Sequence, residues 1–103
     1  MTEYSNMKED MLEAVGEDFD KAIIVVTSDS CVEEHKRKFP KKLMKKPEML
    51  KNVIDYFDYD FDSGYGGQEC HSFYIYTDND VFFIWEYDGS TRISSVPRNP
   101  NYG

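Results

Sequence analysis

The sequence predicts a small α+β domain: two to three helices packed on an antiparallel sheet of three to four strands, plus one strand near residues 22–27. Two aromatic segments near the C-terminus have strand-like alternation and are joined by turn residues. An N-terminal segment has helical spacing of apolar residues, and a β-branched run follows it. At 103 residues, the chain is expected to form a single domain spanning 1–103.

The composition indicates a folded protein rather than a disordered one. Hydrophobic residues make up 40% and aromatic residues 16% of the chain, against 31% charged residues. No apolar run approaches the roughly 20 residues that span a bilayer, and the N-terminus is polar and acidic, unlike a signal peptide. We therefore expect a soluble intracellular protein that makes no membrane contact. Cys31 and Cys70 have no framework spacing, which favours two reduced thiols, with a single disulfide as the alternative.

Capping patterns predict the helices. Asn6 and Glu9 have capping-box spacing at the start of a helix over residues 6–15, and Gly16 is placed to end it. A second helix is predicted over residues 31–39, after Ser30 and before Pro40. A third is predicted to begin near Pro47, and its apolar face would comprise Met49, Leu50, Val53, Ile54 and Phe57.

Strands are predicted from β-branched and alternating segments. The run 22–26, AIIVV, is apolar on both faces, so a central strand covered on both sides is expected. Tyr59 and Phe61 alternate with acidic residues, which indicates a short strand. Three further strands are predicted over residues 72–77, 81–87 and 91–96.

The strand 81–87 is apolar on both of its faces, with Phe82 and Ile84 on one side and Phe83 and Trp85 on the other. We expect helices to cover one face and a contact to cover the other. A partner protein or a second protomer in a homodimer would supply that contact. The alternative is that the exposed aromatic side chains form a binding surface.

The net charge of −8 is unevenly distributed. Residues 36–51 contain eight basic side chains and one acid, a local charge of +7, which leaves −15 for the remainder. A solvated basic face is the ordinary interpretation of such a block, and a recognition surface with two signs of charge is the alternative.

The acidic segment 58–69 matches part of a calcium-loop pattern. Asp58, Asp60, Asp62 and Glu69 occupy positions 1, 3, 5 and 12 of an EF-hand loop. However, Ser63 stands where that loop requires glycine, and a strand rather than a helix is predicted to follow. The pattern favours an acidic strand edge that leads into a glycine turn over a metal site.

No catalytic constellation is identified, and no cofactor is expected. Cys31 and His35 share a helical face, but Cys70 and His71 are adjacent and would point apart in a strand, so a zinc site is not favoured. A thiol nucleophile at Cys70 is poorly supported, because the neighbouring Glu69 would raise its pKa. Catalysis is left unsupported, and an enzyme using Cys70 or His71 stays an open alternative.

Acidic residues around the predicted sheet argue against direct nucleic-acid binding, because they would repel phosphates. Rows of carboxylates can instead imitate phosphates and occupy the basic channel of a nucleic-acid enzyme.

Three segments carry a resemblance. GYGGQE at residues 64–69, EYDGS at 86–90 and SVPRNP at 95–100 resemble a pattern in small uncharacterised proteins of phages and other mobile elements. The resemblance covers the C-terminal 45 or so residues and implies action in the cytoplasm of a bacterial host cell.

These observations together predict a phage-type accessory protein that binds and inhibits a host defence or nucleic-acid-processing protein, such as a nuclease. The alternative is a small-molecule or calcium-binding module that uses the segment 58–69. The candidate partner-binding residues are Asp58, Asp60, Asp62, Tyr65, Glu69, Tyr74, Tyr76, Trp85 and Asp88.

Overall fold

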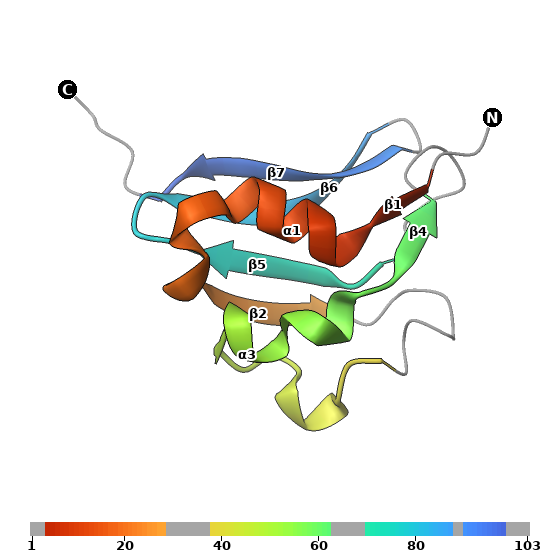
Figure 1. Ribbon diagram of the computed structural model, residues 1–103, viewed down its shortest axis with the longest axis horizontal. Helices are drawn as coiled ribbons and strands as arrows, with labels where there is room; N and C mark the ends of the chain where they lie inside the picture. Colours follow the sequence, from red (N-terminus) through yellow and green to blue (C-terminus); the bar gives the residue numbers. More distant parts are fainter. Residues whose placement is uncertain (1–3, 29–37, 63–69, 88–89, 99–103) are drawn as a thin grey trace.

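The computed structural model describes residues 4–28, 38–62, 70–87 and 90–98 (Figure 1). Its main sheet has five antiparallel strands in the order β3-β2-β5-β6-β7. These strands are β2 (Ile23–Ser28), β3 (Glu48–Met49), β5 (Ser72–Tyr76), β6 (Asp80–Tyr87) and β7 (Ser90–Pro97). The α+β class and the C-terminal meander are therefore confirmed, whereas the sheet has five strands and not the three to four predicted.

Two details of the sheet differ from the prediction. The strand after Phe57, β4 (Asp60–Asp62), leaves the main sheet and pairs with β1 (Tyr4–Asn6) in a separate two-stranded sheet. Glu48 and Met49, which were predicted to be helical, instead pair with Ile24 and Ile23 as β3. Pairing with residues far away in the sequence thus determines the structure of both segments, and the local sequence spacing does not reveal those partners.

The helix α1 (Met7–Val15) forms as predicted. The Asn6 side chain accepts a hydrogen bond from the backbone N–H of Glu9 at 3.0 Å, which satisfies one of the donors left unpaired at a helix start. Gly16 follows with φ of 60°, a backbone conformation that favours glycine. The 3-10 helix η1 (Gly16–Asp20) then leads into β2.

The remaining helices are short: η2 (Lys41–Leu43), α3 (Leu50–Val53) and η3 (Ile54–Phe57). The helix predicted to start near Pro47 thus begins at Leu50, after β3. The helix predicted over residues 31–39 falls mostly outside the described residues. Within the described ranges, no helix has both the length and the apolar character required to cross a membrane.

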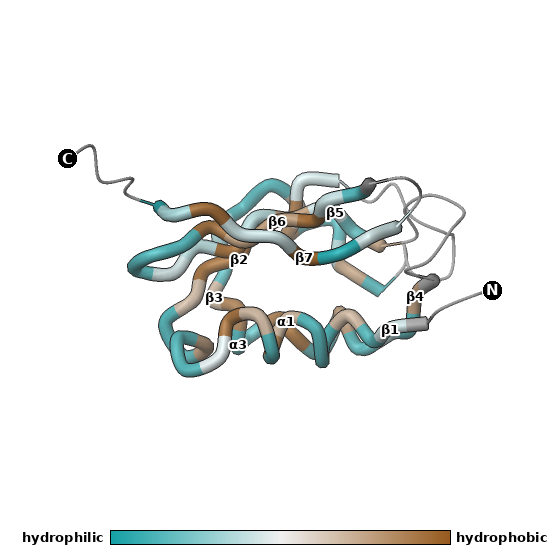
Figure 2. The backbone as a smooth tube through the Cα atoms, turned by 90° about the horizontal axis from the view of Figure 1, so that it is seen from above, coloured by the Kyte–Doolittle hydropathy of each residue, from teal (hydrophilic) through white to brown (hydrophobic). Residues whose placement is uncertain are grey.

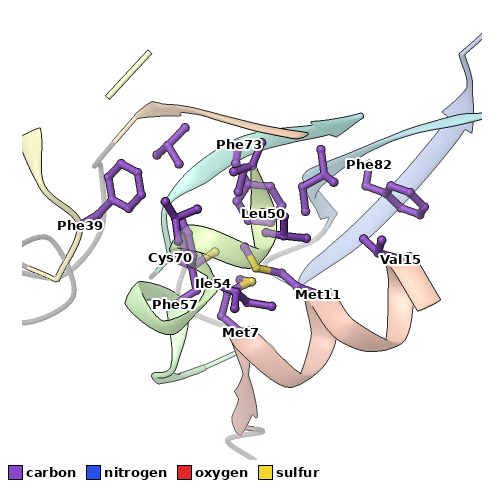
Figure 3. Packing of buried hydrophobic residues seen from close by; sticks show 14 of the residues in the cluster. Met7, Met11, Val15, Phe39, Leu50, Ile54, Phe57, Cys70, Phe73 and Phe82 are labelled. Carbon is purple, nitrogen blue, oxygen red and sulfur yellow. The ribbon is translucent and has the colours of Figure 1, made fainter. Parts of the chain in front are cut away.

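The molecule has two layers. The helices and the small β1–β4 sheet lie on one face of the five-stranded sheet (Figure 2). The hydrophobic core fills the space between the layers, where Met7 and Met11 of α1 meet Leu50 and Phe57 (Figure 3). The sheet contributes Ile24, Val26, Phe73, Ile75 and Phe82. Burial of each such side chain contributes about 1.5–3 kcal/mol, so this interface supplies most of the stability.

Only one face of β2 is covered by the described residues, which corrects the prediction of cover on both sides. Ile24 is fully buried, whereas its neighbour Ile23 is 39% exposed. β2 is an inner strand, paired with β3 and β5 as a central strand would be. The helices lie on a single side of the sheet, so the alternate side chains of β2 face away from them (Figure 2).

Candidate binding surfaces

One face of the five-stranded sheet points away from the helices, and we call it the outer face. Its members follow from the strand register, because directly paired residues project to the same side. Tyr76 pairs with Ile23 and Val81, and Tyr74 pairs with Val25 and Phe83. With the outer-face partners on β3 and β7, the outer face comprises Ile23, Val25, Met49, Tyr74, Tyr76, Val81, Phe83, Trp85, Arg92, Ser94 and Val96.

Large apolar side chains on the outer face are partly open to solvent. Tyr74 is 44%, Trp85 45% and Val96 48% exposed. The rings of Tyr74 and Phe83 lie 6.5 Å apart and form an aromatic pair across two strands. A hollow of about 280 Å³ lies beside them, near the β-bulge in β2. Exposed apolar side chains gathered on one face make that face a candidate interaction site.

Two positively charged side chains lie on or beside the outer face. Arg92 pairs with Trp85 across β6 and β7. The guanidinium of Arg98 lies 5.8 Å from the centre of the Tyr76 ring, and its Nη1 donates a hydrogen bond to the Thr77 carbonyl at 2.9 Å. None of the outer-face positions defined above is a carboxylate.

The structure separates the predicted partner-binding residues into two groups. Tyr74, Tyr76 and Trp85 belong to the outer face. Asp58 and Asp60 belong to the opposite layer, beside β1, where Asn6 Nδ2 donates to both carboxylates at 3.1 and 3.2 Å. Asp62 ends β4 and pairs with Tyr4, whereas Tyr65, Glu69 and Asp88 lie outside the described residues. The candidate acids Asp58 and Asp60 therefore lie in the helix layer, on the other side of the sheet from the candidate aromatics.

The calcium hypothesis stays a prediction, since Glu69 lies outside the described ranges. At the described end of that loop, residues 60–62 are extended and paired as β4. The amide group of Asn6 already donates to Asp58 and Asp60, where a cation would bind. No group of three or more His, Cys, Asp or Glu suited to a metal occurs among the residues described.

Cys70 and His71 are both fully buried at the entry to β5. His71 Nδ1 lies 2.8 Å from Tyr59 Oη, and the His71 backbone N–H donates to the same oxygen at 3.1 Å. The rings of Phe39 and Phe57 pack against the His71 ring. This environment suits a structural histidine, and the two residues proposed as zinc partners, Cys31 and His35, lie outside the described residues.

A second candidate site, missed from the sequence, is a cleft of about 540 Å³ between α1 and β7. Asp10 and Glu13 are three residues apart on α1 and so share the face that lines it. Burial raises the pKa of the Asp10 carboxyl, and the charges of Glu13 and Glu9 raise it further. The remaining lining residues are Ser5, Ala14, Thr91, Arg92 and Ile93.

Thr91 forms the inner wall of this cleft. It is 4% exposed, and its Oγ1 is buried without a hydrogen-bond partner in the described part of the structure. A buried hydroxyl in this state costs about 1–3 kcal/mol. The acid pair at spacing three was visible in the sequence, but its position opposite Thr91 depends on how α1 packs against β7.

The chain matches no family model, no curated protein and no solved structure. Its function must therefore be inferred from these surfaces.

Proposed function

We propose that this protein is a binding protein, which docks a partner protein on its outer face and thereby inhibits it. The aromatic side chains of Tyr74, Tyr76 and Trp85 carry the proposal, because they share the outer face on paired strands. Tyr74 and Trp85 are 44% and 45% exposed. The resemblance of the C-terminal segments to phage and mobile-element proteins favours a bacterial host protein as the partner, in defence or nucleic-acid processing.

The residue types of the outer face are those that dominate protein interfaces. Trp, Tyr and Arg are enriched among the residues whose truncation costs most binding energy. Here they are Trp85, Tyr74 and Arg92, and Ile23 and Val96 add exposed apolar surface to the same face. Tyrosine and tryptophan present a large contact area and lose little side-chain freedom, so strands that hold them in place favour tight binding.

Mimicry of nucleic acid, the finer version of the inhibitor hypothesis, draws its support from the helix layer. Glu9, Glu13, Glu17 and Asp20 are exposed on α1 and η1, and Asp58 and Asp60 lie near the start of α1. We place the phosphate-like carboxylates on this layer and the aromatic contact on the outer face. A partner that used both would wrap around an edge of the molecule.

A capture experiment tests the outer face. The tagged wild-type protein is mixed with bacterial host lysate at low salt, where charge-steered association is strongest, and captured proteins are identified. The Tyr74→Ala/Trp85→Ala double variant should lose the specific protein. A Leu12→Ala/Tyr56→Ala double variant should retain it, because those two side chains are similarly exposed on the helix layer.

Two outcomes would overturn the proposal. One is capture of the same protein by the outer-face variant as by the wild type. The other is quenching of Trp85 fluorescence by single-stranded oligonucleotides with micromolar affinity, since Trp85 is the only tryptophan and stacks on bases if this face binds them. That result would assign the outer face to nucleic acid.

A further inference from the structure

We propose that the cleft between α1 and β7 binds a primary alkylammonium group, held by the carboxylates of Asp10 and Glu13 and by the hydroxyl of Thr91. This site lies between the layers, on the side of the sheet opposite the outer face, and is independent of the function proposed above. The group can come from a free amine or from a lysine side chain of a partner.

The acceptors in the cleft point to a cation. Asp10 and Glu13 both line the cleft, and neither forms an ion pair in the described residues, where Lys8 and Asp55 make the one salt bridge. Two uncompensated carboxylates near each other repel, and a bound cation relieves this repulsion. The pKa of Asp10 is raised first by burial and then by the charges of Glu13 and Glu9.

Thr91 provides a hydroxyl oxygen at the cleft, besides the two carboxylates. It is on the same side of β7 as Ile93, which packs against the core, so it faces the helix layer. Its buried Oγ1 has no partner in the described structure. An ammonium carries three donors and no acceptor, so one such group can satisfy two carboxylates and a hydroxyl.

The apolar lining selects an alkyl chain behind the ammonium group. Ala14 and Ile93 provide walls against which methylene groups can pack. Arg92 stands between Thr91 and Ile93 on β7 and borders the cleft, but by the strand register it belongs to the outer face. A volume of about 540 Å³ suits a small ligand or one long side chain.

The test is a titration of the ¹⁵N-labelled protein with 1,5-diaminopentane at pH 7 in moderate salt, followed by NMR amide shifts. We expect saturable shifts at Ala14, Thr91 and Ile93. The Asp10→Asn/Glu13→Gln double variant should weaken the apparent affinity at least about tenfold. The Glu17→Gln/Asp20→Asn double variant makes the same change in charge outside the cleft and should alter it less than about twofold.

Thr91→Val provides a second variant that keeps the shape of the side chain and removes the hydroxyl. It should weaken binding about threefold or more while the protein remains folded. Shifts that stay linear to high amine concentration, or an equal loss in the charge-matched control, would overturn the proposal, because both indicate non-specific attraction. Equal or tighter binding of Nα-acetyl-arginine methylamide would also overturn the ammonium assignment.

Nα-acetyl-lysine methylamide distinguishes the two sources. Binding of the diamine alone assigns the cleft to free amines, and binding of the lysine compound alone assigns it to a partner's lysine. Binding of both places recognition in the shared ammonium group, and binding of neither refutes the site. The Tyr74→Ala/Trp85→Ala variant should bind the amines like the wild type, so failure of the outer-face proposal leaves this result unaffected.

Discussion

The hydroxyl of Tyr59 and the imidazole of His71 form a buried hydrogen-bonded pair, with 2.8 Å between Oη and Nδ1. The same Oη also accepts a hydrogen bond from the His71 backbone N–H at 3.1 Å, so two contacts join these residues. The pair connects the chain just before β4 to the chain just before β5. It thus ties the helix layer to the sheet.

Replacement of Tyr59 by phenylalanine tests this connection. Tyr59→Phe keeps the ring and removes the hydroxyl, so both hydrogen bonds to His71 are lost inside the protein. The free energy of unfolding should fall by about 1–3 kcal/mol, measured by urea denaturation. Tyr56→Phe, at a 39% exposed ring, should change it by less than about 0.5 kcal/mol. Equal effects of the two substitutions would contradict the structural role of the pair.

Two buried threonines should respond in opposite ways to valine. Thr91 Oγ1 has no partner in the described structure, so Thr91→Val should raise the free energy of unfolding by about 1 kcal/mol. Thr77 Oγ1 donates to the Asp80 carbonyl at 3.3 Å and accepts from the Asp80 backbone N–H at 3.1 Å. Thr77→Val should lower it by about 1–2 kcal/mol. Parallel thermal melts of the two variants measure both changes in stability. A loss of stability in Thr91→Val would show that the Thr91 hydroxyl has a hydrogen-bond partner in the folded protein.

Features set by neighbouring residues were predictable from the sequence. The start of α1 follows from the spacing of Asn6 and Glu9, and β5 to β7 follow from aromatic alternation and turn residues. The exposure of Tyr74 and Trp85 follows from the same alternation once one face is covered. These signals are local, so a single sequence contains them.

Features set by distant pairing were not predictable. Ser5 meets Phe61 in the β1–β4 sheet, and Ile23 meets Met49 in β3. Such contacts depend on the whole arrangement of the chain, and the spacing near Met49 also fits a helix. Because β4 leaves the main sheet, its acids lie away from the aromatics. The cleft likewise exists only because α1 packs over β7.

The pH dependence of stability should report the environment of Asp10. Its pKa is raised from 3.8 by burial and by Glu13 and Glu9, so the folded state binds this proton more strongly than the unfolded state. The free energy of unfolding therefore falls as pH rises from 3.8 through the folded-state pKa. Asp10→Asn should thus be more stable than the wild type at pH 7.

Below pH 3.8 this advantage should disappear, because the wild-type carboxyl is then protonated in both states. Thermal melts at pH 7 and pH 3 measure the difference. Asp20→Asn, at an exposed residue of η1, controls for the loss of one negative charge. A gain that is equal in the two variants, or that persists unchanged at pH 3, would show that general charge repulsion and not the site of Asp10 causes it.

Truncation of a side chain should lower the free energy of unfolding more on the core side of the sheet than on the outer face. Phe73 is 1% exposed in the core, whereas Trp85 on the outer face is 45% exposed. Phe73→Ala should lower the free energy of unfolding by about 3–5 kcal/mol, because it leaves a cavity. Trp85→Ala should lower it by about 1–2 kcal/mol, since much of the indole already contacts solvent and no closed cavity forms.

Acrylamide should accordingly quench Trp85 fluorescence in the folded protein. A cost for Trp85→Ala close to that of Phe73→Ala, together with fluorescence shielded from acrylamide, would mean that the outer face is covered in the protein in solution and unavailable to a partner.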